Sequence, residues 1–457
     1  MATDILKIVY NNCDPKLPAE PRFYADLSNE RGGETFITTT CEELQRSTGW
    51  VRQLFTGHSG CGKSSELQHL IHELRTVREN NTHDRYFPVY IDALEYVDIF
   101  DASLQEILLS VISSVAAELD EKEGISLKNT VIENIFQEIM GLFSGSKTIK
   151  LTVPFWKVTA QIDLKRADPT IREKIRQHLA PRTSGLVAEI NNVLIDARSQ
   201  LGQQMPRDGG TMYRDIVIVV DNLEKIQKLA GHESGEKSAH ALFVEGAPQL
   251  TDIKTHVIYT VPLSLARASG NELMVAYGME PIVLSNVKTE GRGTHHPWEP
   301  GRIALRELLQ KRIDPYRLEQ VFDTDALEFI LTYCGGHIRQ FMNFVRRSTL
   351  YTNSIPIPMD AAQDAVARAV PSFSTEMSKE DWRLLAELEC DTMQQWDTKT
   401  PERRTLMDRL CVLEYVNGDR RQNMFNKATP WYAVHPIVRE LDIFHSAVEA
   451  QRQVKSE

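Results

Sequence analysis

The amino-acid sequence predicts an α/β protein with a doubly wound parallel-sheet core, followed by an all-α lid and a C-terminal domain of helices and a hairpin. Three observations lead to this prediction. Strand-like and helix-like segments alternate through residues 21–290, and a glycine-rich turn joins one of these strands to the helix that follows it. From Glu299 to residue 370, only helix-like segments appear. Alternating strands and helices favour a parallel sheet with helices on both of its faces.

Two aromatic residues stand in the segment before the glycine-rich turn. Residues 1–20 are polar and contain prolines, so we interpret them as an N-terminal lead-in. The aromatic residues Phe23 and Tyr24 follow them, and a position in the protein core is one interpretation of either side chain.

The glycine-rich turn at residues 57–64 is the most specific motif in the chain. It matches G-x-x-x-x-G-K-[ST] at each required position, between an apolar segment at 50–56 and an amphipathic segment at 65–78. This is the strand–loop–helix setting that the motif requires. The glycines let backbone N–H groups surround phosphates, and the N-terminus of the next helix adds a favourable dipole. The motif therefore predicts a P-loop NTPase core that binds a nucleoside triphosphate.

The side chains of this phosphate loop have expected roles. We expect Lys63 to be an exposed clamp on the β- and γ-phosphates, and the Ser64 hydroxyl to be a ligand of Mg²⁺. The residues expected to bind ATP are Gly57, His58, Ser59, Gly60, Cys61, Gly62, Lys63, Ser64 and Ser65.

The segment between the loop and the next motif contains an insertion. Residues 85–92 predict a second strand, and the core-facing spacing of apolar residues from Leu104 to Val115 predicts a helix. Residues 120–210 are too many for an ordinary connection inside such a core. We interpret them as a helical insertion with a β-hairpin at 148–164, followed by two helices.

Two later strands are expected to carry catalytic side chains at their carboxyl ends. Residues 216–220 are all apolar, as in a buried parallel strand, and Asp221 follows them. We expect Asp221 to hold Mg²⁺, directly or through water, and Glu224 to deprotonate the attacking water. A solvated carboxylate at a helix start is the alternative for Glu224. The pattern at 256–262 predicts another strand, which ends in the polar residue Thr260, and residues 282–284 predict the last strand.

The C-terminal third predicts two small domains. Helices are expected at 301–312, 324–334, 337–353 and 359–370, and helical spacing places Arg339 opposite Phe341 and Phe344, toward solvent or bound phosphate. After Pro371, helices including one at 402–413 precede strands at 413–416 and 431–434, which is the order of a winged helix. The predicted domains are a lead-in (1–20), a P-loop NTPase domain (21–290) containing the insertion, a helical lid (291–370) and a winged-helix domain (371–457).

Length and composition indicate how many domains to expect and in which compartment the protein functions. With 457 residues, about two to four domains are expected. The six cysteines are scattered without metal-binding spacing, which favours a reducing cytoplasm. Neither a signal peptide nor an apolar run of the ~20 residues needed to cross a bilayer is visible, so no membrane association is expected. The net charge of −11 argues against a protein coated in nucleic acid.

The order of these parts resembles STAND-class P-loop ATPases and their AAA+ relatives, the origin-recognition initiators, over residues 21–445. The phosphate loop and the D-x-x-[DE] pattern of Asp221 and Glu224 carry the resemblance. It implies that the strand ending at Thr260 lies between the two motif strands and that Thr260 senses the γ-phosphate, a plain strand end being the alternative. It also implies that Arg339, in a G-G-x-x-R turn, contacts the γ-phosphate, and that Phe23 or Tyr24 stacks on the nucleotide base. His435 resembles the histidine of a Met-His-Asp motif that contacts the ADP β-phosphate, although Val434 and Pro436 replace its neighbours; a packed core histidine is the alternative.

The resemblance also implies a function. It points to an ATPase switch that self-assembles into an oligomer and acts with a protein effector in bacterial antiviral defence. An arginine acting in trans is expected, with Arg267 and Arg312 as candidates. The alternative is an initiator-like ATPase that binds duplex DNA, with the pairs at 403–404 and 420–421 as phosphate contacts. Residues 371–457 hold 12 Lys+Arg and 15 Asp+Glu, a net charge of −3, which favours a protein-facing role.

Overall fold

The computed structural model describes residues 2–33, 35–76, 84–127, 134–135, 138, 169–226, 235–417 and 429–456. The chain divides into two compact units. The first consists of Met1–Phe36, Gly57–Glu66 and Val283–Glu457, and the second of Ile37–Thr56 and Leu67–Ile282. The phosphate loop is therefore grouped with the C-terminal part of the chain, whereas the strands that end in Asp221 and Thr260 belong to the second unit.

A five-stranded sheet forms the centre of the α/β core. Its strands are β1 (Arg52–Gly57), β2 (Arg85–Asp92), β3 (Tyr213–Asp221), β4 (His256–Thr260) and β5 (Ile282–Leu284). The strand order is β2-β3-β4-β1-β5, and the pairs β2–β3, β3–β4 and β4–β1 are parallel. As predicted, β4 lies between the phosphate-loop strand and the strand that ends in Asp221.

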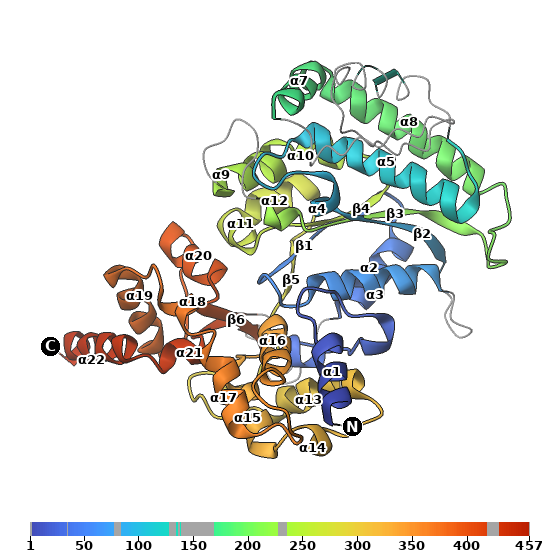
Figure 1. Cartoon of the computed structure of the whole chain (residues 1–457). Helices are drawn as coiled ribbons and strands as arrows, with labels where there is room; N and C mark the ends of the chain where they lie inside the picture. Colours follow the sequence, from blue (N-terminus) through green and yellow to red (C-terminus); the bar gives the residue numbers. More distant parts are fainter. Residues whose placement is uncertain are drawn as a thin grey trace. The chain divides into compact units, whose positions relative to one another are not determined.

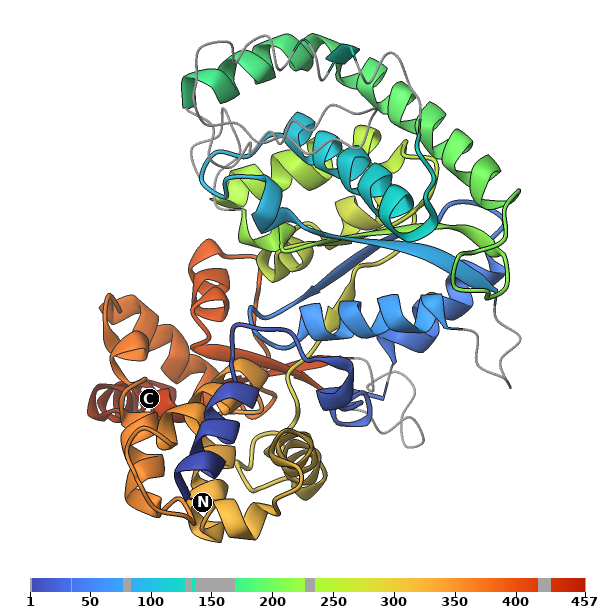
Figure 2. The same ribbon diagram turned by 45° about the vertical axis from the view of Figure 1, so that its right-hand side comes forward.

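Helices cover both faces of this sheet, which confirms the doubly wound fold. Figures 1 and 2 show α5 (Leu104–Glu123) and α8 (Thr183–Leu201) on one face and α3 (Lys63–Arg75) on the other. α5 begins where the Ser103 hydroxyl accepts the Glu106 N–H, and ends at Gly124 with φ 67°. Its buried side chains, including Leu108 and Val115, join Ile216, Ile218 and Val220 of β3 in one core. Burial on both faces explains why β3 is apolar at successive positions.

The insertion is helical where the structure describes it. α7 (Pro169–Leu179) and α8 follow the predicted helices, and the 3₁₀ turn η4 (Ala180–Arg182) joins them. The hairpin expected at 148–164 lies outside the described residues. The second unit also contains short elements that the sequence did not predict: α2 (Phe36–Arg46), α4 (Ala93–Tyr96), η5 (Leu223–Lys225), α9 (Gly235–His240), η6 (Ala241–Glu245), α10 (Ala247–Thr251), α11 (Leu263–Ala268) and α12 (Gly270–Tyr277).

The lid has the four predicted helices and one further short helix. These are α13 (Glu299–Ile313), α14 (Leu318–Val321), α15 (Thr324–Tyr333), α16 (Ile338–Ser348) and α17 (Met359–Ala367). The segment interpreted as a lead-in includes a helix, α1 (Ala2–Asn12), which contacts α13 and α16 and buries Ile5, Leu6 and Val9. Two 3₁₀ turns, η1 (Pro21–Phe23) and η2 (Asn29–Arg31), follow it.

The C-terminal part has helices and a hairpin in the predicted order. It contains α18 (Pro371–Ser374), α19 (Lys379–Glu389), α20 (Pro401–Asp408), the antiparallel pair β6 (Val412–Val416) and β7 (Pro430–Val434), α21 (Pro436–Arg439) and α22 (Asp442–Ser456). The helix expected at 402–413 ends earlier, at Asp408, because Leu410 takes a left-handed conformation with φ 61°. Among the described residues, no helix has both the length and the apolar character needed to cross a membrane.

Candidate nucleotide-binding site

The backbone of the phosphate loop requires its glycines. Gly57, Gly60 and Gly62 have φ values of 151°, 95° and 110°, which side-chain-bearing residues rarely adopt. A Cβ on Gly57 would clash with the Leu284 carbonyl, and one on Gly60 would lie 2.7 Å from the Cβ of Arg339. The glycine spacing of the motif therefore has a steric cause in this structure.

Lys63 is buried, which corrects the expectation that it is exposed. Its side chain folds back against the loop, where Nζ donates to the carbonyls of Gly57 at 2.9 Å and His58 at 3.2 Å, and the residue is 4% exposed. The structure thus holds an ammonium group against the inner carbonyls of the loop, at the N-terminus of α3. A positive charge and a helix N-terminus at one place fit the anionic oxygens of a phosphate chain.

Other loop residues are also held in place by the surrounding unit. The Ser65 hydroxyl accepts the backbone N–H of Ala19 at 2.9 Å, and Cys61 is a fully buried free thiol. Ser64 is half-buried. Of the two hydroxyls after Lys63, Ser65 therefore has a structural partner outside the loop.

Arg31 contacts the phosphate loop and was not predicted from the sequence. Its Nη2 donates to the Cys61 carbonyl at 2.6 Å, and its Nη1 pairs with Glu66 at 3.2 Å. Tyr24 donates its hydroxyl to the same carboxylate at 2.9 Å. Phe23 is 7% exposed, with the Arg22 guanidinium 4.4 Å from its ring centroid, so its place in the structure is the core position. The Gly-Gly pair after Arg31 signals a turn, but no local pattern identifies the partner of this arginine.

The first turn of α16 lies on the phosphate loop. The backbone N–H of Arg339 donates to the Gly60 carbonyl at 3.0 Å, and its guanidinium donates to the Ser59 hydroxyl at 3.1 Å. The ring of His337 lies with Nε2 2.9 Å from the Ser59 carbonyl oxygen. Arg339 is exposed and Phe341 is fully buried, so the helical spacing correctly separated the two faces of α16.

The C-terminal hairpin reaches the same loop through His58. The backbone N–H of Glu414 in β6 donates to His58 Nε2 at 3.1 Å, and both residues are buried. Since this nitrogen accepts, the neutral His58 ring carries its proton on Nδ1. The lid and the hairpin, both far from the loop in sequence, thus contact adjacent loop residues.

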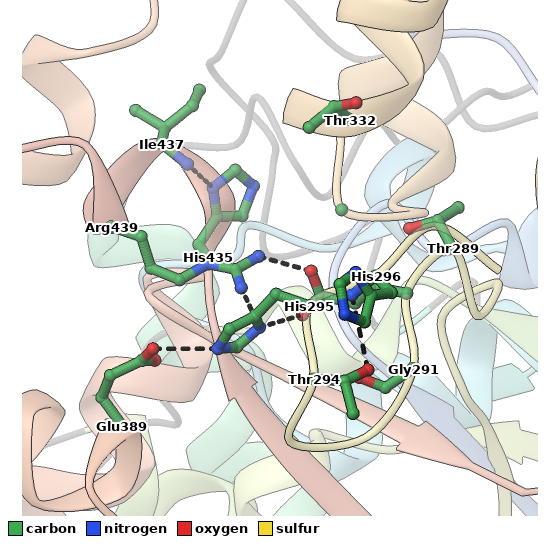
Figure 3. A network of polar contacts seen from close by, with 12 residues as sticks. Thr289, Gly291, Thr294, His295, His296, Thr332, Glu389, His435, Ile437 and Arg439 are labelled. Atoms are coloured by element: carbon green, nitrogen blue, oxygen red, sulfur yellow. Dashed lines mark hydrogen bonds and ion pairs between the residues drawn. The ribbon is translucent and has the colours of Figure 1, made fainter.

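His435 occupies a buried position at the N-terminus of α21. Its Nδ1 accepts the Ile437 N–H at 3.2 Å (Figure 3), its Nε2 lies 2.5 Å from the Gln340 Oε1, and its ring stacks on Phe373 with centroids 4.4 Å apart. Burial lowers the pKa of His435 well below 6.5, so the ring is neutral near pH 7. These contacts match the core-histidine alternative; a contact with the ADP β-phosphate stays a prediction.

Asp221 is buried at the end of β3 in the second unit. Tyr90 donates its hydroxyl to Oδ2 at 2.6 Å, and the Asn222 backbone N–H donates to Oδ1 at 2.7 Å. Asp92 lies opposite Asp221 in register, where its carboxylate accepts both the Leu94 N–H and the Asn222 side-chain amide. Two carboxylates therefore meet at the ends of neighbouring strands.

Thr260 fixes the turn that carries Glu224. Asn222 has φ 65° and starts the 3₁₀ turn η5, in which Glu224 is half-buried. The Thr260 hydroxyl accepts the Leu223 N–H at 3.0 Å and is fully buried. The strand-end threonine and the candidate base are thus joined through one backbone hydrogen bond.

The arginines considered for other roles mostly have partners within the chain. Arg312 is 8% exposed and donates to the Asn12 carbonyl at 2.9 Å, so its position does not suit a contact in trans. Arg267 is half-buried in α11. Arg403 pairs with Glu387 at 2.9 Å, and Arg404 is buried and donates to backbone carbonyls. The pair at 420–421 lies outside the described residues.

A charged cluster joins the start of the lid to the C-terminal helices (Figure 3). His295 lies with Nδ1 3.3 Å from Glu290 and Nε2 2.9 Å from Glu389 of α19. Arg439 of α21 contacts His295 and pairs with Glu290 at 2.5 Å. The two carboxylates outweigh Arg439 and raise the pKa of His295 to about 9. A protonated His295 therefore stabilises this cluster.

Because the folded protein binds the His295 proton more tightly than the unfolded chain, its contribution to stability is full below pH 6.5 and is lost as pH rises through about 9. We expect His295→Gln to lower the free energy of unfolding at pH 6, with the difference from wild type shrinking toward pH 9. Urea unfolding at several pH values measures it, with His296→Gln as the matched control. A His295→Gln deficit that stays constant from pH 6 to 9 would contradict the assignment.

Comparison with known proteins gives similarity to solved structures only. Neither a family model nor a curated protein matches the chain. It is similar to the Aeropyrum pernix ORC2 protein in its ADP form, at 10% identity and TM-score 0.41, covering 96% of this chain and 98% of that one. A chain of Drosophila ORC bound to DNA is similar at 11% identity and TM-score 0.40, covering 97% of this chain and 91% of that one. Cdc6p from Pyrobaculum aerophilum is similar at 13% identity and TM-score 0.34, covering 93% of this chain and 98% of that one. At these TM-scores we base the functional proposal on the residues of this chain.

Proposed function

We propose that this protein is an ATP-binding and ATP-hydrolysing molecular switch whose phosphate loop is coupled to the lid and to the C-terminal hairpin. One observation carries the proposal: adjacent loop residues bond to both domains. Ser59 and Gly60 bond to α16, and His58 bonds to β6. A loop that must accommodate a triphosphate cannot shift without altering these hydrogen bonds, which gives the nucleotide a physical route to the C-terminal part.

The proposed chemistry assigns a role to each group. ATP supplies the phosphoryl group and Mg²⁺ neutralises its charge. Lys63 and the loop N–H groups bind the phosphates, and Ser64 and Asp221 are the proposed ligands of the metal ion. Glu224 is the proposed general base. The buried, hydrogen-bonded carboxylate of Asp221 and the helix N-terminus at Lys63 fit a cation and an anion respectively.

We expect Arg339→Ala to weaken ATP binding more than ADP binding, by about tenfold for ATP, because one hydrogen bond from a cation to phosphate is lost. Arg339 is exposed and bonds to the phosphate loop through Ser59. Titration with both nucleotides measures the effect. Arg347→Ala, on the same helix, is the matched control because Arg347 bonds to Asn343. Equal losses for ATP and ADP would return Arg339 to the solvated face of the lid.

We base the proposed biological role on the STAND-like D-x-x-[DE] pattern. We propose that ATP drives self-assembly into an oligomer that acts on a protein effector in the cytoplasm, in bacterial antiviral defence. Mass measurement with ATP, ADP or no nucleotide, using wild type and Lys63→Ala, tests the assembly. Phage challenge of cells that carry the gene with its neighbours tests the role. Nucleotide-independent mass, or equal phage titres with both variants, would count against this assignment.

The initiator-like alternative makes a different prediction for residues 371–457. Duplex binding would require basic side chains that face solvent, whereas Arg403 and Arg404 bond within the chain. Anisotropy with duplex DNA at two salt concentrations separates the alternatives. Strong, salt-sensitive binding would favour the initiator.

A further inference from the structure

A line of hydrogen bonds joins the phosphate loop to the C-terminal domain. His337 lies with Nε2 2.9 Å from the Ser59 carbonyl oxygen, and its Nδ1 accepts the Gln340 backbone N–H at 3.3 Å. The Gln340 side-chain Oε1 lies 2.5 Å from Nε2 of His435. His435 Nδ1 in turn accepts the Ile437 N–H at 3.2 Å. Two imidazoles and one amide thus connect the loop, α16 and α21.

The partners of each ring determine its tautomer. Nδ1 of both His337 and His435 accepts a backbone N–H, so neither Nδ1 carries a proton. The Ser59 carbonyl and the Gln340 Oε1 are acceptors, so each Nε2 must donate. Both rings are fully buried, and burial lowers the pKa of His337 to about 3. Each histidine is therefore held as one neutral tautomer, and His435 can bond only to an acceptor at Gln340.

The helix N-termini fix this line in space. His337 is the N-cap of α16 and His435 is the N-cap of α21, so each ring is tied to the first turn of its helix. The loop touches the same turn of α16 through the Gly60 carbonyl and the Arg339 N–H. A shift of the loop at Ser59 and Gly60 therefore moves the turn that carries Gln340 relative to His435.

We propose that Gln340 is a positioning residue that transmits the nucleotide state of the phosphate loop to His435, so that His435 responds to nucleotide without contacting phosphate. The inference rests on the proposed function, because it assumes that the loop binds nucleotide. It assigns His435 a different partner from the direct β-phosphate contact that the resemblance implies. The coupling has an energetic cause. When α16 moves, the buried donor His435 Nε2–H loses its acceptor, and an unsatisfied buried donor costs free energy.

The first test removes the acceptor and keeps the volume. Gln340→Met should speed ADP dissociation about tenfold, since a buried donor is left without its partner. His435→Phe should have a similar effect, and the double variant should be no faster than either single one, because both changes break the same bond. Gln340→Glu restores an acceptor of the same length and should dissociate ADP at close to the wild-type rate. Stopped-flow release of a fluorescent ADP analogue from the full chain measures all four.

A control separates transmission from general destabilisation. Leu331→Ala empties a fully buried site in α15 of the lid and should lower the melting temperature, while ADP dissociation stays at the wild-type rate. Gln340→Met should instead change the rate more than the stability. If Leu331→Ala accelerates release as much as Gln340→Met does, or if the effects of Gln340→Met and His435→Phe add, the inference is overturned.

Imidazole nitrogen spectra test the tautomers without relying on kinetics. In ¹⁵N-histidine spectra, the signals of the two rings are assigned by their loss in His337→Asn and in His435→Phe. Both should show the Nε2–H form and stay unchanged from pH 8 to pH 5. An Nδ1–H form, or titration near pH 6.5, would contradict the hydrogen bonds proposed for these rings. If the wild-type protein binds no ADP, the proposed function itself is wrong. If the wild-type protein binds ADP and Gln340→Met releases it at the wild-type rate, only the inference about Gln340 is wrong.

Discussion

Lys63→Ala is expected to abolish nucleotide binding, with a loss of affinity of about 10²-fold or more. The side chain brings a positive charge into a loop whose backbone already favours anions, and alanine brings none. In the structure Nζ donates to the carbonyls of Gly57 and His58, so the loop itself positions the ammonium group. Titration with ATP and ADP, and the shift in melting temperature that each nucleotide causes, measure the loss.

The burial of Lys63 requires a control for stability. Alanine leaves two loop carbonyls without their donor, so the variant should melt somewhat earlier without nucleotide, yet keep its fold. Lys63→Arg, which keeps a charge with a different shape, should melt closer to wild type and recover only part of the affinity. A folded Lys63→Ala protein that binds ATP as tightly as wild type would remove the central claim of the proposed function.

Glu224→Gln is expected to bind ATP normally and to hydrolyse it about 10²–10⁴-fold more slowly, because an amide can hold a water molecule but cannot take its proton. The residue lies in the turn after Asp221, and the Thr260 hydroxyl holds that turn through the Leu223 N–H. Steady-state phosphate release with saturating ATP and Mg²⁺ measures turnover, and equilibrium titration measures binding.

Asp92→Asn is the matched control for Glu224→Gln. The Asp92 carboxylate accepts the N–H groups of Leu94 and Asn222 and so has a structural role at the neighbouring strand end. We expect it to have the smaller effect on turnover. If Glu224→Gln turns over at the wild-type rate and Asp92→Asn does not, Asp92 is the base and Glu224 is a solvated carboxylate.

Local patterns predicted the elements of the fold well. β2 and β5 begin and end at the predicted residues, and the glycine spacing of the phosphate loop matches three positive-φ positions. The 3.6-residue period placed Arg339 opposite the buried Phe341. Patterns of this kind depend only on near neighbours in the chain, and near neighbours decide turns, periodicity and caps. Some elements that were not predicted, such as α4 and α11, have only four and six residues and are too short to show a period. α1 and α2 have eleven residues each and were missed despite their length.

The sequence by itself determined the P-loop motif, the alternation of strands and helices and the polar residues at the strand ends, because steric and hydrogen-bonding rules act over a few residues. Only the tertiary structure decided the partners of those residues. His58 meets a backbone N–H 356 positions away, Gln340 meets His435 95 positions away, and Arg31 meets the carbonyl of Cys61. The burial of Lys63 was decided in the same way, because its Nζ donates to a backbone carbonyl of the folded loop. A local pattern identifies a donor or an acceptor, but its partner depends on how distant segments pack, and packing is a property of the whole chain.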